Sequence, residues 1–155
     1  MLKIIQAISD THINQVKEMF IEYANNLNID LEFQDFKQEL NNLPGDYSPP
    51  TGRLLLAYYK NKLAGCIALR KFNENICEMK RLYIRKEFRS KGIGKALSNQ
   101  VIKVAIKIKY NYMQLDTLPN MKQAISLYKS LGFKKILPYR YNPIKGAKFF
   151  QLKLI

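Results

Sequence analysis

A short basic segment with two glycines, Arg89 to Lys95 (RSKGIGK), has the residue types best suited to bind a ligand. It follows an apolar, strand-like run and opens a long amphipathic pattern that begins near Gly92. The first backbone N–H groups of a helix lack intrahelical partners and lie at the positive end of the helix dipole. Glycine has no Cβ, so a ligand can approach the backbone closely. The segment therefore predicts a site for a phosphate or pyrophosphate.

Three phosphate-binding patterns can be compared with this segment. A Walker A loop ending at Lys95 would need glycine at position 89 and serine or threonine at position 96, where the chain has Arg89 and Ala96. A dinucleotide fingerprint would need a small residue at position 97, where the chain has Leu97. The third pattern, Arg/Gln-x-x-Gly-x-Gly/Ala, fits residues 89–94 in full.

The remainder of the chain predicts strands and helices that would hold this segment in place. Its 155 residues suit a single domain, and no repeat or long linker interrupts the pattern. The expected strands are Leu2–Ile8, Arg53–Lys60, Leu63–Phe72, Ile76–Ile84, Met113–Thr117, Phe133–Leu137 and Lys148–Leu154. The first expected helix begins at a cap on Ser9 or Asp10. The other three expected helices cover Phe33–Leu43, Gly92–Ile108 and Met121–Leu131, and Gly132 follows the last of them. The order is β-α-α-β-β-β-α-β-α-β-β, a mixed α/β plan.

The third pattern resembles the acyl-CoA-binding motif of the GNAT superfamily of N-acetyltransferases, where it follows the fourth strand and starts the third helix. The resemblance extends over nearly the whole chain. Residues 78–84 look like the fourth strand, 115–117 like the fifth, and 120–133 like the following loop, helix and sixth strand. The first two helices match the family in outline alone.

The resemblance implies an α/β (α+β) fold with a mixed, mostly antiparallel sheet of about seven strands. It implies one acyl-CoA N-acyltransferase domain over residues 1–155, with acetyl-CoA as co-substrate. A primary amine of a small molecule or peptide would attack the thioester directly in a ternary complex. The acceptor itself is not identified, and the resemblance also allows a homodimer.

Cofactor contacts are expected on three segments. By resemblance, backbone amides of Arg89, Ser90, Lys91, Gly92, Ile93, Gly94 and Lys95 would bind the CoA pyrophosphate. The fourth strand would splay from the fifth, so that the main chain of Leu82, Tyr83 and Ile84 pairs with the pantetheine arm. A backbone N–H near Leu82 would polarise the thioester carbonyl. Asn120 is expected both to cap the following helix and to contact the cofactor.

The resemblance also implies the catalytic and acceptor-binding residues. Tyr128 would protonate the departing thiolate, although its helical spacing alone fits a core aromatic. Glu78, with a raised pKa, would take the amine's proton directly or through water; the alternative is a solvent-facing glutamate near Lys71 or Lys80. Tyr139 and Arg140 would wall the acceptor site, or would lie in a solvated basic loop.

Composition narrows the remaining function classes. Cys66 and Cys77 fall on expected hairpin strands, where Cys77 would face Lys71 and Cys66 would face Leu82, so no disulfide is expected. With His12 as the sole histidine, no zinc or other metal site is expected. No apolar run is long enough to span a membrane and the first residues do not resemble a signal peptide, so a cytoplasmic protein is expected.

A formal charge of +14 leaves two other classes open. A basic protein can bind nucleic acid, but the lysines are spread along the chain without interleaved aromatics or a nucleic-acid motif, which disfavours that class. A non-catalytic CoA-binding or CoA-sensing module would keep residues 89–95 and show no acceptor-dependent thiol release. An acetyl-CoA-dependent N-acetyltransferase is the favoured hypothesis.

Overall fold

A computed structural model describes residues 1–27, 31 and 35–155, and shows seven strands in one sheet. The strands are β1 (Leu2–Gln6), β2 (Arg53–Tyr59), β3 (Lys62–Lys71), β4 (Ile76–Ile84), β5 (Tyr112–Thr117), β6 (Lys134–Ile136) and β7 (Lys148–Lys153). Their spatial order is β1-β2-β3-β4-β5-β7-β6, and each pair is antiparallel except β4 and β5. The predicted mixed, mostly antiparallel sheet is confirmed.

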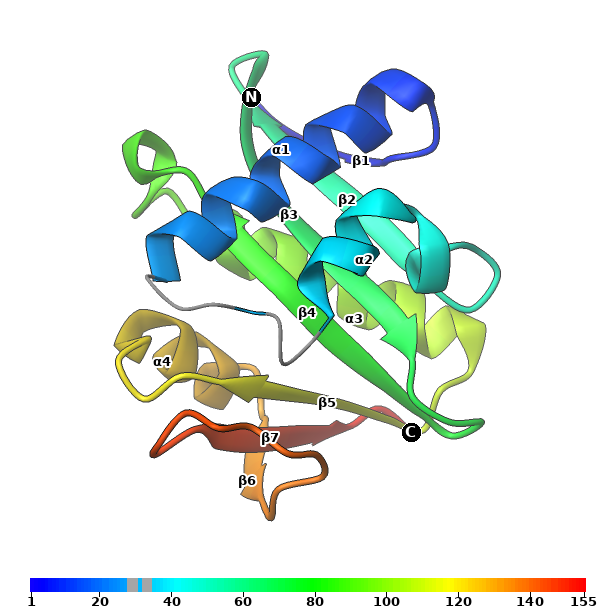
Figure 1. Cartoon of the computed structure of the whole chain (residues 1–155), viewed down its shortest axis with the longest axis vertical. Helices are drawn as coiled ribbons and strands as arrows, with labels where there is room; N and C mark the ends of the chain where they lie inside the picture. The colour runs from blue at the N-terminus through cyan, green and yellow to red at the C-terminus, as the bar shows by residue number, and fades with distance from the viewer. Residues whose placement is uncertain (28–30, 32–34) are drawn as a thin grey trace.

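Helices cover both faces of the sheet (Figure 1). The long helices are α1 (Asp10–Leu27), α3 (Ile93–Ile108) and α4 (Lys122–Ser130), with a short α2 (Phe36–Asn41) and 3-10 turns η2 (Gly45–Tyr47) and η3 (Lys86–Phe88). Side chains alternate across each strand, so Leu54 and Leu56 pack in the core under α1 while Leu55 and Ala57 belong to the core that includes α3. The sheet therefore separates two apolar cores.

Several element boundaries differ from the sequence prediction. The predicted helix start at Phe33 lies outside the described residues, and α2 is described from Phe36. The expected cap at Asn120 is wrong, because Met121 occupies the N-cap position of α4 and no side chain caps that helix. Ser9 does cap α1, since its hydroxyl accepts a hydrogen bond from the backbone N–H of His12 at 3.2 Å.

Strand β4 contains a bulge at Arg81, which has a left-handed φ of 61°. The register with β3 shifts between Ala68, which pairs with Lys80, and Cys66, which pairs with Tyr83. The prediction that Cys66 faces Leu82 is therefore wrong by one residue, because a bulge places two residues opposite one. The predicted pair of Lys71 and Cys77 is confirmed.

Both cysteines are free thiols, which agrees with the expectation that they form no disulfide, and both are buried. Burial raises the pKa of the Cys66 thiol, and it raises the pKa of Cys77 to about 12. A thiol with so high a pKa carries almost no thiolate at neutral pH, and the thiolate is the nucleophilic form. Neither cysteine is suited to accept an acyl group.

Strands β4 and β5 are paired over part of their length only. Three parallel pairs join them, ending at Glu78 and Gln114, while β4 continues to Ile84 and β5 to Thr117. In Figure 1 the two strands start side by side and spread apart toward α4. The predicted splay is confirmed, and it leaves the second half of β4 without a sheet partner on the β5 side.

Candidate active site

A groove of about 490 Å³ lies where β4 and β5 separate. We call it the large groove; it is bounded by the end of β4, the segment before α3, the first turns of α4, and α1. Its lining residues are Tyr23, Asn26, Leu27, Leu82, Tyr83, Ile84, Phe88, Arg89, Ser90, Gly92, Ile93, Gly94, Asn120, Met121, Lys122, Gln123, Ala124 and Leu127. The volume is in the usual range for a small-molecule or cofactor site.

Nine of the eleven predicted cofactor residues line this groove, and Lys91 and Lys95 do not. The ammonium of Lys91 instead lies over the Tyr59 ring, 5.3 Å from its centre. Sequence reasoning missed the lining residues from α1, Phe88 of η3, and the residues at the start of α4. They are Tyr23, Asn26, Leu27, Phe88, Met121, Lys122, Gln123, Ala124 and Leu127. The glycine motif gives no signal for the residues at α4, because α4 comes close only through the sheet topology.

The segment before α3 has the backbone shape that an anion site needs. Gly92 is the N-cap of α3 with a φ of 77°, and Ser90 has a φ of 65°. A Cβ placed on Gly92 would meet nothing within 4 Å, so the backbone there borders open space. The guanidinium of Arg89 donates to the carbonyl of Ile84 at 2.9 Å and ties the segment to the end of β4. The predicted turn and helix start are both present.

The exposed edge of β4 borders the large groove through Leu82, Tyr83 and Ile84. The Tyr83 side chain points to α1, where its hydroxyl accepts from the Asn26 amide at 3.0 Å and donates to Glu22 at 3.3 Å. These contacts fix the strand while its main chain stays at the groove. A ligand with amide groups could therefore add to this edge as an extra strand.

A second, much smaller cavity of about 40 Å³ continues from the large groove. We call it the small chamber. Tyr23, Leu27, Leu82 and Met121 line both cavities. The polar and charged side chains unique to the chamber are Lys80, Arg81, Asp116, Thr117, Tyr128 and Asn142. A ligand in the groove would thus reach a confined, polar space at its inner end.

Tyr128 is a core aromatic that also lines a cavity. It is 6% exposed, and its ring packs against Phe133 and Phe150 with centroid distances of 5.8 and 6.5 Å. It also lines the small chamber. Burial raises the pKa of Tyr128, so the phenol keeps its proton at neutral pH. A protonated phenol in a confined space is equipped to donate that proton.

Glu78 lies at the centre of a buried cluster of charges, which we call the polar cluster: Arg70, Glu78, Tyr139 and Arg140. The Glu78 carboxylate is fully buried and accepts from Arg70 at 2.8 Å, from Arg140 at 2.8 Å, and from the Tyr139 hydroxyl at 2.8 Å. Two elements far apart in sequence, β4 and the β6–β7 loop, are joined by these bonds.

The predicted rise in the pKa of Glu78 is wrong. Burial alone would raise this pKa, but the charges of Lys80, Arg70 and Arg140 and the Tyr139 hydrogen bond outweigh it, so the pKa lies below its ordinary value. Glu78 is thus held as an anion, and the alternative of a solvent-facing glutamate is also wrong. Tyr139 and Arg140 are held against β4, not in a freely solvated loop.

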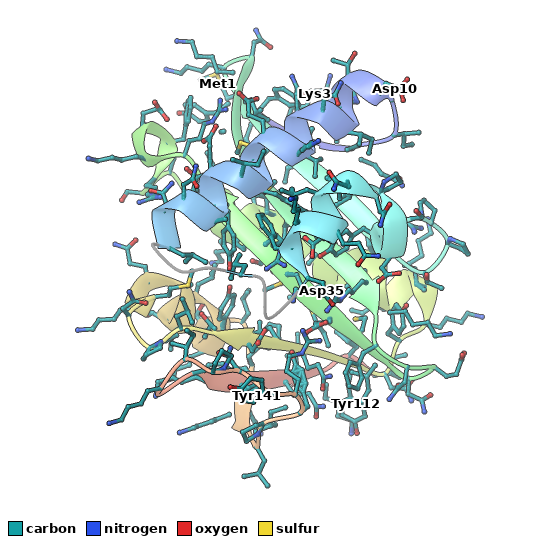
Figure 2. All side chains as sticks on the ribbon, viewed as in Figure 1. Met1, Lys3, Asp10, Asp35, Tyr112 and Tyr141 are labelled. Atoms are coloured by element: carbon teal, nitrogen blue, oxygen red, sulfur yellow. The ribbon has the colours of Figure 1, made fainter. Side chains whose placement is uncertain are left out.

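Lys80 and Asp116 bring further charges to the same face. Lys80 is 6% exposed, and its pKa is lowered to about 7. Burial is the main cause, and the positive charges of Arg81 and Arg70 lower the pKa further. The negative charges of Glu78 and Asp116 act in the opposite direction and are outweighed. Asp116 accepts a hydrogen bond from the Asn142 amide at 3.2 Å. In Figure 2, the label Tyr141 marks the loop beside β7 that also contains Asn142. The label Asp35 marks the start of α2, which lies on the other side of β5 in this view.

The bulge residue Arg81 is clamped by α2. Its guanidinium is 2% exposed and donates twice to Glu39, at 3.0 and 2.9 Å. The same group lies over the rings of Tyr23 and Phe36, at 5.8 and 5.3 Å from their centres. A bidentate pair between two aromatic rings fixes the side chain firmly. The left-handed backbone of Arg81 sits directly before Leu82, which borders both cavities.

The sequence profile of the acetyltransferase (GNAT) family matches residues 13–133, most of the chain. The chain belongs to the GNAT family. An uncharacterized N-acetyltransferase of Dictyostelium discoideum is 37% identical, and the match covers 99% of each protein. One from Schizosaccharomyces pombe is 38% identical over 92% of this chain and 88% of that protein. Together these findings make this GNAT protein an acyltransferase.

More distant relatives and solved structures extend this picture. N-acetylaspartate synthetase of Xenopus tropicalis is 32% identical over 63% of this chain, which spans 39% of that protein. A GNAT acetyltransferase from Staphylococcus aureus Mu50 shares the fold with a TM-score of 0.82, at 22% identity over the whole of both chains. One from Elizabethkingia anophelis, solved with acetyl-CoA bound, has a TM-score of 0.71 at 21% identity, covering 98% of this chain and 97% of that one.

Within residues 1–27, 31 and 35–155, no group of three His, Cys, Asp or Glu side chains is placed to hold a metal ion. Across the same described residues, no helix has the length and apolar character needed to cross a bilayer.

Proposed function

We propose that this GNAT protein transfers the acetyl group of acetyl-CoA to a primary amine, which attacks the thioester directly in a ternary complex. The observation that carries the proposal is the continuity of the two cavities. The turn at Ser90 to Gly94 lines the large groove, and the groove shares Leu82 and Met121 with the small chamber, which Tyr128 lines. The acetyl-CoA bound in a structure of the same fold supports this choice of co-substrate.

The backbone at Gly92 to Gly94 would bind the pyrophosphate, and the free edge of β4 would pair with the pantetheine amides. The thioester carbonyl would then reach the inner end of the groove, where the N–H of Leu82 can polarise it. The amine nitrogen forms a bond to the carbonyl carbon and the carbon–sulfur bond breaks. Tyr128 donates its proton to the departing thiolate, because burial keeps the phenol protonated.

The amine must lose two protons in all, one before it attacks and one after. Glu78 is a poor acceptor for them, since both of its oxygens are engaged by Tyr139, Arg70 and Arg140 and its pKa is lowered. Asp116 borders the small chamber, and we propose that it holds the acceptor's ammonium and passes protons to solvent. Glu78 then orders the β6–β7 loop. Direct transfer also agrees with the inert, high-pKa cysteines.

Replacement of Tyr128 by phenylalanine tests this proposal. Tyr128→Phe keeps the ring contacts and removes the proton donor, so kcat should fall by about 100-fold or more while the Kd for acetyl-CoA changes little. The measurement is free-thiol release from acetyl-CoA with an amine panel, alongside calorimetric binding. Tyr112→Phe, at the far end of β5, is the matched control and should behave as the parent.

Three results would contradict the proposal in different ways. Equal kcat for Tyr128→Phe and parent would remove Tyr128 from the mechanism. Acetyl-CoA binding without thiol release for any amine would instead support the non-catalytic CoA-binding module. A protein that binds polyanions with a steep salt dependence and ignores CoA would support the nucleic-acid-binding class.

A further inference from the structure

We infer that the acceptor amine carries a carboxylate, and that Gln114 and Arg140 hold that carboxylate beside the polar cluster. The inference rests on the proposed acetyl transfer and names the class of acceptor. It starts from two buried donors: the side-chain N–H groups Gln114 Nε2 and Arg140 Nε have no hydrogen-bond partner among the described residues. Buried polar groups are nearly always paired, so two unpaired donors at one site require a reason.

Both donors lie beside Glu78, on the face of the sheet that also carries Lys80 and Asp116 of the small chamber, and neither donor lines the chamber itself. Gln114 on β5 is the register partner of Glu78 on β4, so the two side chains lie on the same face of the sheet. Arg140 bonds to that same Glu78 through Nη2 at 2.8 Å. Gln114 is 2% exposed, so bulk water does not supply the missing partner. The two donors therefore lie beside the Glu78 carboxylate, whose oxygens already accept hydrogen bonds from Arg70, Tyr139 and Arg140 Nη2.

The chemistry of the missing partner follows from the donors. An N–H group needs a hydrogen-bond acceptor, and a carboxylate accepts at two oxygens with no competing donor. A second anion also suits the charges, because Arg70 and Arg140 face the single carboxylate of Glu78. An ammonium or a neutral alkyl group would leave both donors unpaired.

Asp116 supplies the complementary contact for the amine. It lies two residues after Gln114 on β5, so both side chains project from the same face about 7 Å apart at the backbone. Asp116 lines the small chamber, where the thioester would be attacked, and Gln114 lies on the side away from the splay. A small amino acid, with ammonium and carboxylate a few bonds apart, spans these two positions.

The proposal gives an unusual expectation for Gln114→Met. Methionine has a similar volume and no donor, so the variant removes an unpaired buried group from the free enzyme. Its Tm should therefore equal or exceed that of the parent, while its KM for a carboxylate-bearing acceptor should rise at least tenfold. If Gln114 binds the acceptor, the variant should lose binding while its stability is retained or increased. If Gln114 were only structural, the variant should lose stability.

Matched acceptors provide the test. L-Aspartate, L-glutamate and L-alanine are compared with the corresponding amides and with propylamine, by free-thiol release from acetyl-CoA. The parent should acetylate at least one of the acids with a kcat/KM tenfold or more above that of its amide. In Gln114→Met this ratio should collapse through a higher KM for the acid. Arg140→Lys, which keeps the charge and loses Nε, should also reduce the ratio.

A binding measurement separates the inference from the proposed function. With CoA present, the preferred acid should raise the Tm of the parent and not that of Gln114→Met. Thiol release that is as fast with propylamine or the amides as with the acids overturns the carboxylate inference and leaves acetyl transfer intact. An unchanged KM for the acid in Gln114→Met overturns the role of Gln114. Failure of acetyl-CoA to bind or react at all overturns the proposed function, and the inference with it.

Discussion

The two sides of the splayed strand β4 are built by different means. The large groove is bordered mainly by main chain and apolar side chains, and the turn proposed to bind an anion is formed by backbone dihedral angles at Ser90 and Gly92. The other side, where the acceptor is proposed to bind, is built from buried charges, chiefly Glu78 with its guanidinium partners and the Arg81–Glu39 pair. We therefore expect the groove to recognise its ligand through backbone shape, and the other side to do so through charged side chains that each need a partner.

This difference teaches where substitutions should matter. A turn made by the backbone tolerates changes of its side chains, provided that the dihedral angles and the open space remain. A buried ionic cluster does not, because removal of one partner leaves the others charged and unpaired. Four substitutions, taken from the largest expected effect to the smallest, would break or sharpen this contrast.

Glu78→Gln should have the largest effect, and it should act on stability. Loss of the central charge leaves Arg70 and Arg140 without their anion, which should lower the free energy of unfolding by about 3 kcal/mol at neutral pH. Because the folded pKa of Glu78 lies below its ordinary value of 4.5, the parent's advantage is complete above that pH and declines as pH falls through the folded pKa.

Urea denaturation of parent and Glu78→Gln at several pH values measures this effect. Glu87→Gln, an exposed site, is the control and should match the parent. The acetyl-CoA affinity of Glu78→Gln should stay within about twofold of the parent, since the proposed cofactor groove does not include it. A difference in stability that is independent of pH would contradict an ionised, paired Glu78.

Gly92→Glu should weaken acetyl-CoA binding by about 100-fold, because a bulky anion would enter the open space at the turn. The positive φ of 77° adds a cost of about 1 kcal/mol in stability. Gly45→Glu carries the same charge at a positive φ of 46°, outside the groove, and is the matched control. Calorimetry should show a loss of acetyl-CoA affinity for Gly92→Glu alone. Equal losses in both variants would mean that the turn at Gly92 does not bind the cofactor.

Lys80→Met should change how stability depends on pH. The pKa of Lys80 is lowered from 10.5 to about 7. Between these values the unfolded chain binds a proton that the folded protein does not, so the parent's free energy of unfolding rises with pH. The slope is at most about 1.4 kcal/mol per pH unit. Denaturation at about pH 7.5 and about pH 9 should show that the free energy of unfolding depends less on pH in Lys80→Met than in the parent. The exposed control Lys103→Met should keep the slope of the parent. Equal slopes in Lys80→Met and the parent would refute the lowered pKa of Lys80.

Lys91→Ala should have the smallest effect. Its ammonium lies over Tyr59, and the residue does not line the groove, so the Kd for acetyl-CoA should change by less than about threefold. Lys122→Ala removes a cation that lines the groove in the first turn of α4, and its effect should be larger. The reverse order in calorimetric Kd values would mean that the basic segment acts through its side chains after all.

Local signals account for what the sequence predicted well. The order of strands and helices follows from hydrophobic periodicity, and the turn at Gly92 follows from glycines at a helix start. The splay and the positions of Leu82 to Ile84 came from the family resemblance, and the pairing pattern confirms the splay. The catalytic role of Tyr128, the cofactor contact of Asn120, a homodimer and a cytoplasmic location stay predictions.

The errors arise where distant segments meet. The bulge at Arg81 has no sequence signal, because a non-glycine residue at positive φ is held there by its tertiary contacts. The pKa of Glu78 depends on Arg140, 62 residues away in sequence. Periodicity describes which face a residue occupies, and it does not reveal which charges approach that face from another element.

The Glu39–Arg81 pair couples helix α2 to the part of β4 that borders both cavities. Helix α2 is only six residues long and lies about 40 residues before β4 in the sequence, yet its Glu39 holds the residue next to Leu82 on β4. A chimera that exchanges α2 for that of a relative would therefore need to bring its own acidic partner for Arg81. Without it, a graft intended to alter acceptor preference would also disturb the reaction rate for every acceptor.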